Sequence, residues 1–134
     1  MFEDFIKRLT EAALLAGILL FVGCSSLGAP VMVKSAGQGG SVIHLKASSF
    51  KFEPNNLRVP EPGPLTIEVK NISDIEHNIS IKNPQGKVIK SVDLPAMKTV
   101  SIALNLAGPG KYEFYCDKPI HDLMGMNGQL QVGS

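Results

Sequence analysis

Short stretches of alternating apolar and polar residues recur along the chain from residue 42 onward. In the run 65–70, apolar residues at every second position would face one side of a strand and polar residues the other. Breaks rich in Gly, Pro and Asn separate these stretches, and no helical periodicity appears after residue 40. The expected strands are 42–47, 56–59, 65–70, 77–81, 87–91, 99–104, 111–116 and 129–132. One buried face per strand is typical of an all-β sandwich or barrel.

The N-terminal segment has a different pattern. Lys7 and Arg8 precede an uninterrupted apolar run at 12–22. A membrane span needs about 20 apolar residues, so this run better fits the hydrophobic region of an export signal. The segment 21–24 resembles a bacterial lipobox, which predicts lipidation of Cys24. An uncleaved membrane anchor and simple secretion after cleavage at Gly28 remain as alternatives.

All three alternatives export the rest of the chain. The protein is therefore expected at the periplasmic or outer face of a bacterial or archaeal membrane. Lipidation and the uncleaved anchor, the two favoured alternatives, would also tether it through its N-terminus. We divide the chain into a signal or anchor at 1–24, a flexible Gly- and Ser-rich linker at 25–41, and a head domain at 42–134. A head of about 100 residues is long enough to bury one core.

Composition excludes some functions. The net charge is +1, with acidic and basic residues interspersed, so neither nucleic acid nor an anionic membrane surface is expected as a partner. Cys24 and Cys116 are the only cysteines, and each has a local context of its own, so no disulfide is expected.

The candidate chemistry lies near the C-terminus. Cys116, His121 and Met126 follow one another at intervals of five, and His77 lies upstream in the sequence Glu-His-Asn. One thiolate, two imidazoles and a thioether are the ligands of a mononuclear blue-copper electron-transfer site. His77 has to come from another part of the fold, which places the expected site between two packed elements.

Neighbouring residues support such a site. Tyr112 and Phe114 share one face of their strand with Cys116, so the sulfur should point into an apolar interior. Asn78 follows His77 directly and is expected to hydrogen-bond to the loop that carries Cys116. Gly125 and Gly128 allow a tight loop around Met126.

The chain resembles the cupredoxin family, in particular its plastocyanin, pseudoazurin, amicyanin and auracyanin types. The resemblance covers about residues 42–132. Its motifs are Phe50-x-Phe52-x-Pro54, Val69-Lys70-Asn71, Glu76-His77-Asn78, Gly110-x-Tyr112-x-Phe114-x-Cys116 and His121-x-x-Met124-Gly125-Met126-x-Gly128. It implies a Greek-key β-sandwich of about eight strands and one type 1 copper ion.

The resemblance implies that His77, Cys116, His121 and Met126 are the copper ligands of this chain. Met124 is an alternative axial ligand, but the position of Met126 before Gly128 matches the family motif better. A binuclear copper domain needs two cysteines in the ligand loop, and a multicopper oxidase needs more histidines than the three present.

The expected function is a monomeric one-electron carrier, not an enzyme. An exported copper-trafficking protein of the same fold is the alternative. In relatives the histidine corresponding to His121 lies near solvent, so Ile120, Leu123 and Met124 would form an apolar patch for transient docking. Expected partners are redox proteins: a quinol-oxidising complex, an oxidase, a photosynthetic reaction centre or a reductase.

Overall fold

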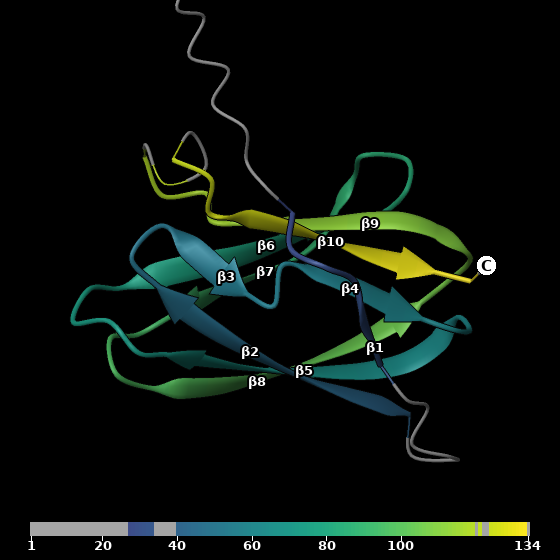
Figure 1. The fold of residues 1–134 in the computed structure, drawn as a ribbon, viewed down its shortest axis with the longest axis horizontal. Helices are drawn as coiled ribbons and strands as arrows, with labels where there is room; N and C mark the ends of the chain where they lie inside the picture. Colours follow the sequence, from purple (N-terminus) through teal and green to yellow (C-terminus); the bar gives the residue numbers. More distant parts are fainter. Residues whose placement is uncertain (1–26, 34–39, 120, 122–123, 134) are drawn as a thin grey trace, which may run out of the picture.

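The computed structural model describes residues 27–33, 40–119, 121 and 124–133. These residues form ten β-strands in two sheets that pack face to face (Figure 1). The strands are β1 (Val31–Met32), β2 (Ser41–Ser48), β3 (Lys51–Glu53), β4 (Asn56–Val59), β5 (Gly63–Asn71), β6 (His77–Lys82), β7 (Val88–Leu94), β8 (Thr99–Leu106), β9 (Gly110–Tyr115) and β10 (Asn127–Val132). None of the described residues belongs to a helix long and apolar enough to cross a membrane.

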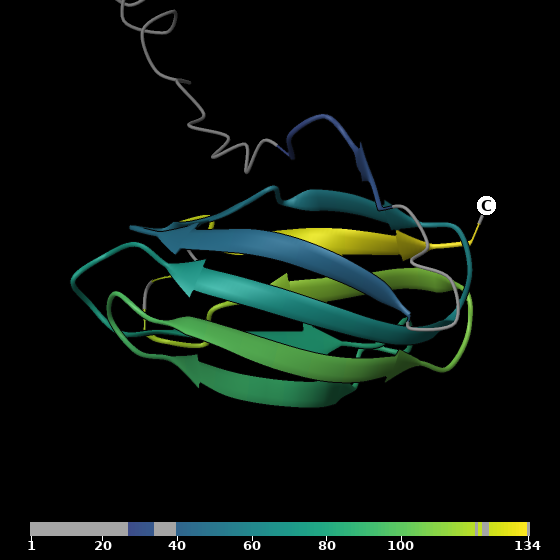
Figure 2. The same cartoon turned by 90° about the horizontal axis from the view of Figure 1, so that it is seen from below.

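The two sheets are both mixed. The larger has the order β1-β4-β10-β9-β6-β7, in which β4 runs parallel to both β1 and β10 and the other pairs are antiparallel. The smaller has the order β3-β2-β5-β8, with β2 parallel to β5. Figure 2 shows the two layers from below. Such a sandwich buries the inner faces of both sheets in one core.

The alternating pattern explains the core. In β5 the apolar residues Leu65, Ile67 and Val69 are buried, whereas the residues between them are at least partly exposed. Phe52 from the smaller sheet meets Phe114 from the larger one edge-to-face, with ring centroids 5.6 Å apart. This contact joins the two layers directly beneath the strand that leads to Cys116.

All eight predicted strands are confirmed, most of them longer by one to three residues. The sequence pattern missed β1 and β3, which have only two and three residues and therefore show no periodicity. β1 lies within the segment expected to be a linker, yet it pairs with β4, and the next residue, Val33, is buried in the core. The rest of that linker, 34–39, lies outside the described residues, as does the predicted signal or anchor at 1–24.

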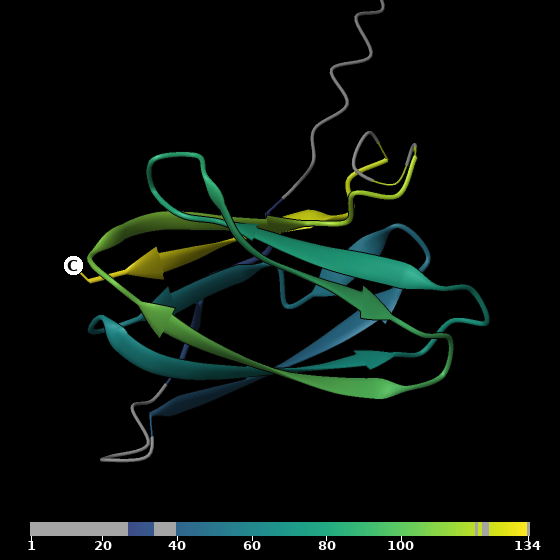
Figure 3. The ribbon, with the colours of Figure 1, turned by 180° about the vertical axis from the view of Figure 1, so that it is seen from behind.

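One end of the sandwich carries the candidate chemistry, and we call it the site end. There β5 ends, β6 begins at His77, β9 ends one residue before Cys116, and β10 begins one residue after Met126. The far end carries the turns around 60–62, 83–87 and 107–109. Figure 3 shows both ends from behind.

Candidate metal centre

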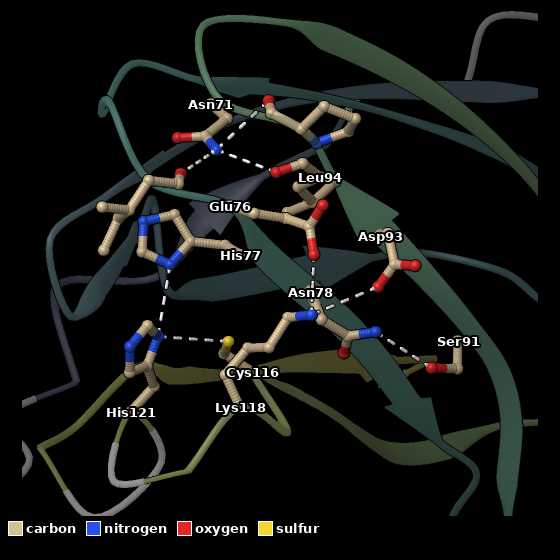
Figure 4. Close-up of polar contacts among 12 residues, drawn as sticks. Asn71, Glu76, His77, Asn78, Ser91, Asp93, Leu94, Cys116, Lys118 and His121 are labelled. Carbon is tan, nitrogen blue, oxygen red and sulfur yellow. Dashed lines mark hydrogen bonds and ion pairs between the residues drawn. The ribbon is translucent and has the colours of Figure 1, made fainter.

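Three of the predicted ligands come together at the site end. The Nδ1 atoms of His77 and His121 lie 3.3 Å apart, and Cys116 Sγ lies 3.5 Å from His121 Nδ1 (Figure 4). One ligand atom from each of the three residues lies within 4.8 Å of the others. His77 begins β6, whereas Cys116 and His121 come from the loop after β9, so the site joins two elements that are 39 or more residues apart in the chain.

Met126 lies next to this cluster. Cys116 N donates a hydrogen bond to Met126 O at 3.0 Å, and Met126 N donates to His121 O at 3.0 Å. Met126 is completely buried, whereas Met124 is 56 % exposed. These two bonds close the loop, and the positive φ of Gly125 (93°) lets the chain turn between the two methionines.

The geometry of the donor atoms fits a metal ion. Bonds of about 2.0–2.3 Å from one ion to three trigonal ligands separate the ligand atoms by roughly 3.5–4 Å. The contacts of 3.3 and 3.5 Å around His121 are close to that spacing. A soft thiolate with two imidazoles suits copper better than a hard cation.

A hydroxyl group fixes the tautomer of His77. Ser73 Oγ lies 2.8 Å from His77 Nε2 and 2.8 Å from Asn71 Oδ1. The amide oxygen of Asn71 and the carbonyl of Ile75, 3.1 Å from Ser73 Oγ, can only accept. The single Ser73 hydroxyl proton is therefore directed to them, and to the nearer Asn71 first, so that Ser73 accepts from His77 Nε2–H. This arrangement leaves Nδ1 of His77 unprotonated, with its lone pair facing His121 and Cys116.

Asn71 holds Ser73 in place. Its amide oxygen also accepts from Ser73 N at 3.0 Å, and its Nδ2 donates to Ile75 O at 2.8 Å and Leu94 O at 2.9 Å. The side chain is completely buried at the end of β5. Sequence reasoning did not assign Asn71 or Ser73 to the site, although Asn71 ends one of the motifs shared with the cupredoxin family. The signal for Ser73 was a short polar segment before His77.

Removing the Ser73 hydroxyl should weaken metal binding. We expect Ser73→Ala to lower copper affinity by about 10- to 100-fold, because outer-shell partners of metal-binding histidines have effects of that size. Competition with a copper chelator measures the affinity. Ser73→Thr keeps the hydroxyl and should bind nearly as tightly, and Ser101→Ala on the exposed face of β8 is the neutral control. Equal affinities for Ser73→Ala and Ser101→Ala would contradict the assignment.

Burial also favours the neutral form of His77. Desolvation lowers the pKa of His77 below its usual value, and the nearby imidazole of His121 lowers that pKa further. Below about pH 6.5 the unfolded chain would therefore take up a proton that the folded metal-free protein does not, and stability would fall. Above that pH both states are neutral at this position and the contribution is constant.

We therefore expect the metal-free protein to lose stability as pH falls below about 6.5, until the folded-state pKa of His77 is passed. Urea unfolding at a series of pH values measures this dependence. His77→Gln should show a smaller fall over the same interval, because the titrating group is gone. The same slope in both proteins would show that other groups cause the change.

Asn78 has a less direct role than expected. Its Nδ2 donates to Ser91 Oγ on β7 at 3.1 Å, and its Oδ1 lies 3.0 Å from Ser80 Oγ. Ser80 Oγ in turn lies 3.0 Å from Asp117 Oδ2, in the residue after Cys116. The predicted link to the ligand loop therefore passes through Ser80. Strand periodicity explains this, because residues 78 and 80 point to the same face of β6.

An ion pair makes a second connection between the halves of the site. Lys118 Nζ lies 2.8 Å from Glu76 Oε1 and 3.7 Å from Asp93 Oδ1 (Figure 4). The bond to Glu76 raises the pKa of Lys118. Glu76 directly precedes His77 and Lys118 lies two residues after Cys116, so this contact orients the two ligand-bearing segments.

An aromatic side chain packs against the outer side of the site. The ring of Phe50 meets that of His121 edge-on, with centroids 5.0 Å apart. Phe50 has a φ of 59°, which is uncommon for a non-glycine residue and is typical of constrained functional segments. His121 itself remains partly exposed. In the predicted docking patch Met124 is exposed, whereas Ile120 and Leu123 lie outside the described residues.

Comparisons with known proteins agree with this architecture. The family model of the cupredoxin-like domain matches residues 13–132. No curated protein matches the chain by sequence.

Several solved structures share the fold at low sequence identity. Dithionite-reduced auracyanin from Roseiflexus castenholzii matches with a TM-score of 0.62 and 20 % identity, over 69 % of this chain and 97 % of that one. Auracyanin A, a blue copper protein from Chloroflexus aurantiacus, matches with a TM-score of 0.60 and 19 % identity, over 78 % and 100 %.

A third similar structure is a metal-binding domain. It belongs to the Cu(I)-exporting P-type ATPase CopA of Streptococcus pneumoniae D39, was solved with Cu(I), and matches with a TM-score of 0.62 and 15 % identity, over 81 % and 100 %. At these identities the structures support the fold alone.

The family match, together with the arrangement of His77, Cys116, His121 and Met126, is consistent with a single type 1 copper site. The chain belongs to the cupredoxin-like family.

Proposed function

We propose that this protein is an exported one-electron carrier with a single type 1 copper ion bound by His77, Cys116, His121 and Met126. The observation that carries the proposal is the convergence of two imidazole nitrogens and a thiol sulfur at metal-ligand spacing on a buried β scaffold. Bound copper would supply a Cu(II)/Cu(I) couple. The burial of Met126 and the exposure of Met124 support Met126 as the fourth residue that would hold the ion.

The protein's own residues would keep the ligands in nearly the same place in both oxidation states. Ser73 orients His77, and the backbone bonds of Met126 to Cys116 and His121 close the ligand loop. The Lys118–Glu76 pair connects the two segments. Small geometric change lowers the reorganisation that accompanies electron transfer, and a soft thioether ligand favours the reduced ion.

Electrons would enter and leave through His121. It is the most exposed of the three clustered donors, whereas His77 and Cys116 are completely buried. Its neighbours Phe50 and Met124 present apolar surface, which suits a small and transient redox interface. The proposed donors and acceptors are a quinol-oxidising complex, an oxidase, a photosynthetic reaction centre or a reductase.

A copper-trafficking role is the second candidate, since a Cu(I)-exporting ATPase contains a domain of similar fold. Transfer of the metal requires ligands that a partner can reach. Here Cys116 and Met126 are completely buried, so exchange should be slow.

Two rates distinguish the candidates. An electron carrier should be reduced and reoxidised reversibly many times without losing copper, and its Cu(I) should pass to an excess of Cu(I) chelator only slowly. Rapid loss of Cu(I) to the chelator, together with irreversible redox cycling, would favour trafficking.

A further inference from the structure

The N-terminal segment is attached to the head along an edge of the larger sheet. Gly28 N donates to Asn55 Oδ1 at 2.8 Å, and Asn56 Nδ2 donates to Gly28 O at 2.9 Å. Beyond these bonds β1 pairs with β4, and Val33 N donates to Arg58 O at 2.8 Å. Residues 27–33 are therefore an ordered part of the folded head domain, held by hydrogen bonds and strand pairing.

The direction of this segment places its start at the site end. β1 runs parallel to β4, which runs parallel to β10, and β10 begins one residue after Met126. The chain therefore passes from the site end toward the far end as it runs along β4 (Figure 1). A groove also places the start of the segment at the site end. Gly28 and Ala29 line this groove together with Phe50, Met124 and Gly125.

The interval between the predicted anchor and Leu27 is short. Leu27 lies three positions after Cys24 and five positions after Val22, the last residue of the apolar run. An extended chain spans at most about 3.3–3.6 Å per residue, so these intervals reach about 10 Å and about 18 Å. An anchor at either position would hold the site end close to the membrane surface.

The site end is also rich in exposed apolar side chains. Ile75 lies two residues before His77, Met97 N donates to Ser73 O, and Met124 lies in the ligand loop. These three side chains are 42 %, 68 % and 56 % exposed. The far end also has exposed apolar side chains, Val42, Val88 and Ile89, but they lie on strands β2 and β7. Its turns, such as Asn83-Pro84-Gln85-Gly86, are rich in proline, glycine and polar residues.

We propose that the N-terminal segment, docked on β4, holds the copper end of the head against the membrane from which the chain comes. The partner would then be an integral membrane redox protein that exposes an apolar surface close to the bilayer. A soluble carrier approaching from the aqueous side would meet the far end. The inference rests on the proposed electron-transfer function for the nature of the partner, whereas the orientation rests on the fold and on the N-terminal anchor expected from the sequence.

Two tryptophan variants of the full chain test the orientation, because the sequence contains no tryptophan. Met124→Trp places the probe at the site end, and Gln85→Trp places it in the far-end turn. Strands of eight or nine residues separate the two ends by roughly 30 Å. The chain is produced in a bacterium that processes lipoproteins and is reconstituted in phosphatidylcholine–phosphatidylglycerol vesicles, with or without dansyl-labelled headgroups.

Energy transfer from tryptophan to dansyl is then compared between the two variants, each in the same metal state with both vesicle types. We expect the emission of Met124→Trp to fall by at least half and that of Gln85→Trp to change little. Equal transfer from both positions, stronger transfer from Gln85→Trp, or failure of the chain to float with the vesicles would overturn the proposal. A blue absorption band in the same samples tests the electron-transfer function separately.

A third variant tests the role of the docked segment. Val33 is buried, so Val33→Asp should detach β1 by placing a charge in the core. Combined with Met124→Trp it should reduce energy transfer, because the longer free segment no longer holds the site end near the surface. Unchanged transfer in a variant whose blue band and unfolding midpoint show an intact head would contradict the role assigned to β1.

Discussion

Replacing Gly128 with alanine should destabilise the folded protein by about 3 kcal/mol or more, at the upper end of the range for overpacked cores. A Cβ at this position would lie 2.6 Å from Asn55 O and closer still to the ring of Phe114. The ring packs against Phe52 across the core, and the carbonyl belongs to a backbone that accepts a bond from Gln129 N. Neither neighbour can move without disturbing the junction of β4, β9 and β10.

Urea unfolding measures this effect, and Gly108→Ala is the matched control. No heavy atom outside its immediate neighbours lies within 4 Å of a Cβ built at Gly108, so that substitution should change stability little. Similar unfolding free energies for the two variants would show that the region around Gly128 can relax. The blue band of any folded Gly128→Ala protein should also shift, because β10 begins next to Met126.

Replacing Asn71 with alanine should have a comparable effect on stability and a further effect on the metal. The substitution removes the Nδ2 donor from the carbonyls of Ile75 and Leu94 and the acceptor for Ser73 N and for the Ser73 hydroxyl. Each buried polar group left unsatisfied costs about 1–3 kcal/mol, so we expect a total loss of about 3 kcal/mol or more. Copper affinity should fall as well, because Ser73 would no longer be held against His77.

Asn105→Ala, on an exposed position of β8, is the control for the loss of an asparagine side chain. The unfolding free energy and the copper affinity are measured for both variants. A loss of stability with unchanged copper affinity would show that the Asn71–Ser73 contacts support the fold without positioning His77. A loss of less than about 1 kcal/mol would contradict the account of Asn71 altogether.

The sequence predicted the architecture well because strand alternation and turn residues are local signals. Most of the predicted strands alternate buried and exposed positions, as β5 does at Leu65, Ile67 and Val69. β6 is buried along nearly its whole length and β7 is mostly exposed, so these two were predicted from their composition and from the turns that bound them. β1 and β3 were missed since two or three residues carry no pattern. Their positions depend on pairing with strands elsewhere in the chain, which no local signal records.

The donor cluster could also be predicted from the sequence, because the residue types and spacing of Cys116 and His121 are specific to one kind of metal site. The surrounding hydrogen bonds were less predictable. Asn78 reaches the ligand loop only through Ser80, and the tautomer of His77 depends on Ser73, in a loop whose course the sequence does not specify. The contact of Phe50 with His121 requires a positive φ that sequence reasoning did not anticipate.

The most direct test of the central claim is the visible absorption of residues 27–134 after addition of Cu(II). This fragment retains β1 and contains Cys116 as its only cysteine. We expect an intense blue band that bleaches on reduction, returns on oxidation, and is absent in Cys116→Ser. A protein that binds copper without this band, or a band that survives in Cys116→Ser, would contradict a thiolate-bound redox site.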